Sequence, residues 1–132
     1  ISAEKIIFCT GIADEQNPWF RALPFSANKG EALVIACPGL NDKHIFKQHY
    51  LLAPLPEPDL FWVGANYQNI FTSPLPTDAF RQQAAAYLKE WLRLPFSIEA
   101  HLAAVRPATV ERRPFVGLHP HHPAVGILNG MG

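Results

Sequence analysis

The sequence has little cysteine and shows no metal or redox spacing. It holds 2 cysteines, Cys9 and Cys37, in 132 residues, which cannot build a disulfide framework, and no CxxC pair is present. Both cysteines stand in apolar runs, where a small thiol is usually buried and reduced. We therefore expect two buried thiols in a reducing, cytoplasmic compartment.

The sequence also lacks an excess charge of either sign and any long hydrophobic run. Eleven basic residues balance eleven acidic ones, so there is no basic footprint for nucleic acid. The longest apolar runs, such as 32–36 and 51–55, are far shorter than the roughly 20 residues that span a bilayer. We expect neither a nucleic-acid partner nor a membrane span.

What is present is the composition of one globular domain, with 48% apolar residues and 13 prolines concentrated between the expected elements. The first apolar run is β-branched and continuous, which predicts a strand buried on both faces. A proline-rich turn at 54–59 between two strand-like runs predicts a hairpin. About six or seven strands are predicted from these patterns: Lys5–Thr10, Glu31–Cys37, His44–Ala53 (one strand or two short ones), Leu60–Asn66, Ile98–Ala104, Phe115–Leu118 and Val125–Asn129.

One segment has the period of a helix. Thr77 is a suitable N-cap, Asp78 favours the first turn, and Pro95 ends the pattern. A single helix among many strands predicts the α+β class. We expect a mostly antiparallel, mixed sheet with one main helix packed on it.

Arg106 is the charged residue that most needs a partner. It follows the apolar run 101–105 and precedes Pro107, which fixes the backbone there. A guanidinium at the end of a buried strand is costly unless it meets an anion, and its planar fork suits a carboxylate. The residues alone leave two interpretations open, a ligand carboxylate and a structural ion pair with an internal Asp or Glu.

The other polar candidates favour ordinary structural roles. His119, His121 and His122 form a cluster, but the prolines within it hold the loop extended, so a solvated loop is favoured over a metal site. Tyr50 and Tyr67 could each place a phenol at a pocket edge or simply sit at the edge of the core. No catalytic acid, base or nucleophile is identified, and no metal site is predicted.

The two ends of the chain differ from the usual polar, frayed termini. The sequence begins at Ile1 without methionine and ends in an apolar run, 127–128, that enters the glycine-rich turn 129–132. We therefore expect a segment excised from a larger protein.

Several motifs occur in the order of a known family. The closest match is Arg106-Pro107-Ala108-Thr109 followed by Pro114 and Gly117. The chain resembles the FAD-dependent oxidoreductases of the D-amino-acid oxidase, glycine oxidase and sarcosine oxidase type. It departs from that pattern where Ala104 replaces a glycine and where Glu111-Arg112 replaces Asp-Gly. The remaining motifs that carry the resemblance are Ile6–Gly11, Lys29-Gly30-Glu31, Phe61–Tyr67 and Asn129–Gly132.

The resemblance implies that a parent enzyme transfers a hydride from an amine or amino acid to FAD. It implies that Arg106 binds the substrate carboxylate, that Tyr67 lines the pocket, and that Gly11, Gly130 and Gly132 contact the flavin. The GxGxxG fingerprint for the FAD pyrophosphate is absent from these 132 residues. They would then be a single substrate-binding domain, with 1–11 and 125–132 as remnants of the flavin-binding domain.

On this interpretation the chain alone neither retains FAD nor turns over substrate. Its exposed sheet could pair with a second copy to form a homo-oligomer. The alternative is a stand-alone α+β domain that binds a small molecule or peptide without catalysis. A third interpretation, a metal-binding domain built on the His119–His122 loop, has less support in the sequence.

Overall fold

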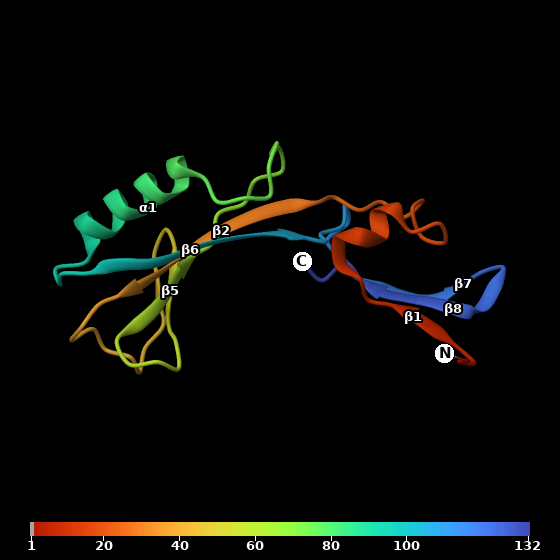
Figure 1. The fold of residues 1–132 in the computed structure, drawn as a ribbon, viewed down its shortest axis with the longest axis horizontal. Coiled ribbons are helices and arrows are strands. Elements are labelled where there is room, and N and C mark those ends of the chain that lie inside the picture. The colour runs from red at the N-terminus through yellow and green to blue at the C-terminus, as the bar shows by residue number, and fades with distance from the viewer. Residues whose placement is uncertain (1) are drawn as a thin grey trace. The chain divides into compact units, whose positions relative to one another are not determined.

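The computed structural model describes residues 2–132, which form eight strands, one α-helix and one 3₁₀ helix (Figure 1). The α+β class with mostly antiparallel strands is confirmed, and the strands divide into two sheets. The elements are β1 Ile6–Phe8, η1 Gly11–Gln16, β2 Asn28–Ala36, β3 Phe46–Lys47, β4 Leu51–Pro54, β5 Leu60–Gly64, α1 Asp78–Trp91, β6 Ser97–Arg106, β7 Phe115–His119 and β8 His122–Asn129.

The chain forms two compact units. The first, called the terminal unit below, comprises the chain up to Asn28 together with Val105–Gly132, and the second, the central unit, comprises Lys29–Ala104. The boundary falls within β2 after Asn28 and within β6 before Val105. Most of each of these two strands therefore belongs to the central unit, while their ends contribute to the terminal unit.

The central unit is built on a five-stranded sheet of order β3-β4-β5-β2-β6 with α1 packed against it. Its helix begins where the sequence predicts, because the Thr77 hydroxyl accepts a hydrogen bond from the Phe80 amide and caps the first turn. The helix ends at Trp91, before Pro95, since Leu92 is already extended. One apolar core joins the sheet to the helix: Leu33, Ile35, Cys37, Tyr50, Leu52, Phe61, Val63, Phe80, Ala84, Leu88 and Leu92.

The predicted hairpin is confirmed. Strands β4 and β5 pair antiparallel with Pro54 opposite Phe61, and the proline-rich turn joins them. Asp59 completes that turn with a φ of 61°, in the left-handed region that Asp tolerates better than most residues. The turn thus reverses the chain with residues suited to it.

The terminal unit contains a three-stranded sheet of order β1-β8-β7, in which β1 runs parallel to β8. The expectation that this first strand is buried on both faces is wrong. Ile6 is 53% and Ile7 50% exposed, because β1 is an edge strand of a small sheet. The expectation of a buried thiol holds for Cys37 but not for Cys9, which follows β1 and is exposed.

Two further findings concern the helices. The segment that follows β1 forms the 3₁₀ helix η1, which no predicted element covered. Within residues 2–132, none of the helices has the length and apolar character needed to cross a bilayer.

Candidate functional site

Arg106 lies at the end of β6, next to β2 in the sheet order, and is half-buried. Its Nη1 donates a hydrogen bond of 2.8 Å to Oδ1 of Asn28, the first residue of β2. Pro107 follows and the chain turns, with the Ala108 amide bonded to the Arg106 carbonyl. The strand end therefore places the guanidinium beside a neutral amide oxygen.

The glycine-rich C-terminal segment packs directly against Arg106. A Cβ added at Gly132 would lie 2.6 Å from the Arg106 Cβ and 2.9 Å from the Pro107 nitrogen. Gly130 has a φ of 82°, and a Cβ there would lie 2.5 Å from Cγ2 of Thr109. Both glycines are thus required by close packing within the terminal unit itself.

Gly11 is tied to the same segment. The side-chain nitrogen of Asn129, Nδ2, donates to the Gly11 carbonyl at 2.7 Å. The side-chain oxygen of Asn129, Oδ1, accepts from the backbone amide of Gly130 at 2.7 Å. Gly11 has a φ of 63°, and the space beside its Cα is open. The terminal unit therefore brings together four of the five predicted site residues: Gly11, Arg106, Gly130 and Gly132.

A buried carboxylate that was not predicted from the sequence, Asp14, fixes the Asn129 side chain that bonds Gly11. Asp14, in η1, is fully buried and accepts hydrogen bonds from Asn129 at 2.6 Å, Thr10 at 2.6 Å and Asn17 at 2.9 Å. Burial raises the pKa of the Asp14 carboxyl, but the hydrogen bonds from these three neutral side chains outweigh it, so the pKa lies below its usual range. In the sequence, the polar residues close to Gly11 are the feature that could have indicated this buried carboxylate.

Tyr67 belongs to the central unit, in the loop that follows β5, and its side chain is 77% exposed. The base of this loop is fixed on β2. Lys29 and Gln68 exchange two backbone hydrogen bonds of 2.9 Å, and the Asn66 side-chain oxygen accepts from the Glu31 amide at 2.7 Å. The Tyr67 side chain therefore projects from a firmly anchored loop.

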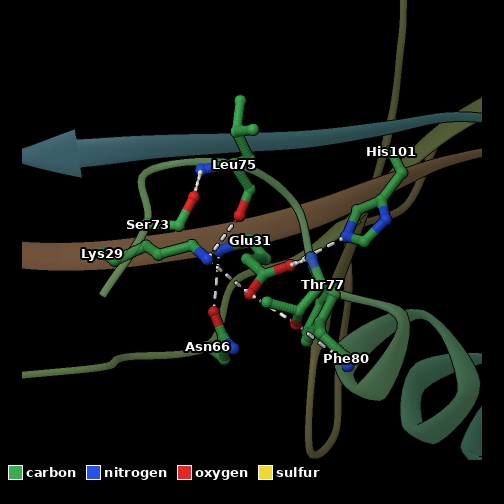
Figure 2. A network of polar contacts seen from close by, with 8 residues as sticks. All are labelled: Lys29, Glu31, Asn66, Ser73, Leu75, Thr77, Phe80 and His101. Carbon is green, nitrogen blue, oxygen red and sulfur yellow. Dashed lines mark hydrogen bonds and ion pairs between the residues drawn. The ribbon is translucent and has the colours of Figure 1, made fainter. Parts of the chain in front are cut away.

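The anchor centres on a second buried carboxylate, Glu31, which Figure 2 shows beside Thr77 at the start of α1. The Glu31 oxygens accept from the Thr77 amide at 2.6 Å and the Thr77 hydroxyl at 2.9 Å, and Lys29 Nζ lies 3.2 Å away. Lys29 Nζ also donates to the Leu75 carbonyl at 2.5 Å. Burial raises the pKa of Glu31, but the bonds from Thr77 and Lys29 outweigh it and lower the pKa.

His101, on β6, completes the Glu31 network (Figure 2). Its Nε2 lies 3.0 Å from Glu31 Oε2, and its ring stacks on Phe80 with centroids 5.6 Å apart. An ionised carboxylate only accepts, so Nε2 carries the proton in this contact. The sequence held one signal for the network, because Lys29 and Glu31, two apart on a strand, face the same side.

The histidine cluster lies at the turn between β7 and β8. The ring centroids of His119 and His122 are 5.0 Å apart, and Trp19 lies 4.5 Å from His122. Burial lowers the pKa of His119, and the nearby His122 and His121 lower it further. Across residues 2–132, no three His, Cys, Asp or Glu side chains are grouped so as to hold a metal ion.

The whole chain has the fold of part of several solved oxidases, although no protein-family model matches it. Glycine oxidase from Geobacillus kaustophilus superposes with a TM-score of 0.81 at 16% identity, covering 99% of this chain and 37% of that one. The chain shares its fold with glycine oxidase. Iminodiacetate oxidase from Chelativorans sp. BNC1 superposes with a TM-score of 0.73 at 21% identity, covering 100% of this chain and 38% of that one. Glycine oxidase from Bacillus cereus ATCC 14579 superposes with a TM-score of 0.73 at 18% identity, covering 98% of this chain and 37% of that one.

These matches confirm the resemblance suggested by the motifs at the level of the fold. The chain spans 37–38% of the length of these three structures. Identities of 16–21% do not carry residue roles from one protein to another. The roles of Arg106, Tyr67 and the three glycines therefore stay predictions.

Proposed function

We propose that this chain is the substrate-binding domain of an FAD-dependent oxidoreductase that oxidises an amine or amino acid. The observation that carries the proposal is the fold match over 98–100% of the chain to glycine oxidase and iminodiacetate oxidase. The substrates in those names share one chemical group, an amine nitrogen and a carboxylate on the same carbon. We extend that class of substrate to this chain.

Arg106 is the residue we assign to the carboxylate. Arg106 is half-buried at a strand end. Pro107 restricts the backbone that follows it, and Gly132 packs closely against both residues. A fixed guanidinium binds a carboxylate with two parallel hydrogen bonds and so orients the rest of the substrate. Tyr67, in the central unit, stays a predicted pocket residue of the parent protein, and we assign no residue of this chain a proton-transfer role.

The cofactor is FAD, held mainly by residues outside this chain. When bound, FAD supplies the acceptor for a hydride from the carbon beside the amine. Of the glycines expected to contact it, Gly11 has open space where a group could approach, whereas Gly130 and Gly132 pack against their own chain. With the GxGxxG fingerprint absent, we expect the 132 residues alone to retain no FAD and to show no turnover.

An exposed apolar face in the terminal unit supports the interpretation of residues 1–11 and 125–132 as parts of a flavin-binding domain. Val116 is 70% exposed, and Ile7, Leu118 and Leu128, on the same face of the sheet, are exposed as well. Apolar side chains gathered on one small sheet mark a surface that another part of a protein covers. Alternatively, a second copy of the chain covers this surface, which would give a homo-oligomer.

The free thiols Cys9 and Cys37 accord with a reducing, cytoplasmic setting.

The proposal is tested on the full-length protein that contains this sequence, with the 132-residue chain beside it. We expect a flavin absorption spectrum from the first and none from the second, and peroxide release with an amino acid. Arg106→Lys should raise KM for the amino acid by about 10- to 100-fold, the loss of a charged bidentate pair, with a smaller change for an amine without a carboxylate. A colourless full-length protein would contradict the proposal.

One observation favours the alternative of a stand-alone binding domain. The terminal unit holds an open surface pocket of about 510 Å³ whose lining includes Trp19, Phe20, Phe115 and His119. Pockets of this size and apolar character take small molecules. Binding of a small aromatic compound by the 132-residue chain, together with a colourless full-length protein, would favour this second function.

A further inference from the structure

Asn28 and Arg106 form a contact that bridges two neighbouring strands of the sheet. Asn28 is the first residue of β2 and is only 5% exposed, and Arg106 is the last residue of β6. The 2.8 Å hydrogen bond joins residues 78 apart in the sequence. Both residues belong to the terminal unit.

The contact restricts a long side chain with several rotatable bonds. An unrestrained arginine loses rotamer entropy when it binds a carboxylate, and this loss weakens binding. A buried amide oxygen that accepts from Nη1 fixes the plane of the guanidinium before any ligand arrives. We propose that Asn28 is a positioning residue that orients Arg106 for the substrate carboxylate, an inference that rests on the proposed function.

The chemistry of the Asn28 side chain suits this role. An amide oxygen accepts a hydrogen bond without carrying a charge, so this bond leaves the positive charge of Arg106 in place. A carboxylate at residue 28 would accept the same bond but form an ion pair, and would then compete with the substrate carboxylate. Asn28 and Arg106 each make further contacts, and the inference concerns this bond alone.

The test compares two variants in the full-length, flavin-loaded protein. Asn28→Asp has the same shape as the natural residue and adds one negative charge, and Asn28→Ala removes the acceptor. We expect Asn28→Asp to raise KM for the amino acid about tenfold or more, and Asn28→Ala to raise it several-fold. The KM for a carboxylate-free amine should change little in both, and kcat should change less than KM.

Asn17→Ala is the matched control. Asn17 is another buried asparagine of the terminal unit, and it bonds Asp14 rather than Arg106. Its loss destabilises the same unit without touching the guanidinium. We expect any change in KM in this variant to be equal for the two substrates.

The outcomes separate the inference from the function on which it rests. If Arg106→Lys leaves KM for the amino acid unchanged, the assignment of the carboxylate anchor is wrong. If Arg106→Lys raises that KM but neither Asn28 variant does, the anchor stands and the positioning role is overturned. Equal rises for both substrates in the Asn28 variants also overturn it, because they indicate a purely structural role.

A measurement on the unaltered 132-residue chain covers the case in which a variant does not fold. We expect the guanidinium NH2 groups of Arg106 to give separate nitrogen NMR signals, because the bond to Asn28 slows rotation about Nε–Cζ. Exposed Arg93 should give averaged signals. Averaged signals at Arg106 would overturn the inference without any substitution.

Discussion

The two units of the molecule bury their side chains in different ways. The central unit covers its five-stranded sheet with α1 and encloses one apolar core. The terminal unit leaves Ile6, Ile7 and Val116 of its three-stranded sheet exposed. Its buried contacts are largely polar and are centred on Asp14 and Asn129. The central unit thus has the core of an independent domain, whereas the terminal unit depends more on a hydrogen-bond network.

Each unit also buries one carboxylate, and the partners differ. Glu31 in the central unit meets the ammonium of Lys29. Asp14 in the terminal unit accepts hydrogen bonds from the neutral side chains of Thr10, Asn17 and Asn129. Removal of the charge therefore strands a buried cation in the first case and leaves only misdirected hydrogen bonds in the second.

The largest expected effect follows from that difference. Glu31→Gln should destabilise the central unit by about 3–5 kcal/mol, because Lys29 is left buried without an anion. Asp14→Asn should destabilise the terminal unit by about 1–3 kcal/mol, because the new NH2 group faces that of Asn129. Urea unfolding with amide exchange assigned to each unit measures both. Equal losses of unfolding free energy in the two variants would contradict this expectation.

A double variant and the pH dependence sharpen this test. Lys29→Met with Glu31→Leu removes both charges and should recover much of the stability lost in Glu31→Gln. The pKa values of Glu31 and Asp14 are both lowered by folding. Their contribution is therefore complete above the unfolded pKa of about 4 and is lost as the pH falls through the folded pKa. Asp14→Asn should remove this acid dependence from the terminal unit alone.

An intermediate effect is expected from apolar truncation. Leu33→Ala, in the central core, should cost about 3 kcal/mol through lost burial and the cavity left behind. Val116→Ala, on the exposed sheet of the terminal unit, should change the free energy of unfolding of this chain by less than about 0.5 kcal/mol. Thermal and urea unfolding of the two variants, side by side, measure the difference. A loss at Val116 as large as that at Leu33 would show that a second copy covers the sheet in solution.

The smallest effect concerns two backbone turns, one in each unit. Arg112 has a φ of 57° and Asp59 a φ of 61°, in the left-handed region that favours glycine. Arg112→Gly should stabilise the protein by about 0.5–1 kcal/mol, because an arginine is strained there by about 1–2 kcal/mol and glycine costs more entropy on folding. Asp59→Gly should gain less, since Asp tolerates this conformation better. Melting temperatures compare the two, and a larger gain at Asp59 would contradict the expectation.

Local patterns in the sequence predicted much of the fold. The helix start at Thr77, the hairpin around 54–59 and the α+β class all follow from caps, turns and periodicity. These features depend on residues within a few positions of one another, so the sequence displays them directly. The order of the family motifs likewise predicted the resemblance to glycine oxidase.

The candidate site was predicted only in part. Arg106 was identified from its place at the end of an apolar strand, but its partner Asn28 is 78 residues away. Asp14 and Asn129 are 115 residues apart, and Glu31 meets His101 across 70 residues. Such pairs depend on which strands become neighbours, and no local pattern reports that.

By itself, therefore, the sequence determined which stretches become the main strands, the hairpin turn and the helix, because backbone preferences and side-chain periodicity act over short stretches. The tertiary structure alone decided which charges are paired and which apolar runs are covered. The run at β1 and the run at β2 look alike in the sequence, yet Ile7 is half exposed and Leu33 fully buried. The physical reason is that burial depends on what packs against a strand: β2 lies between two strands beneath α1, and β1 is an edge.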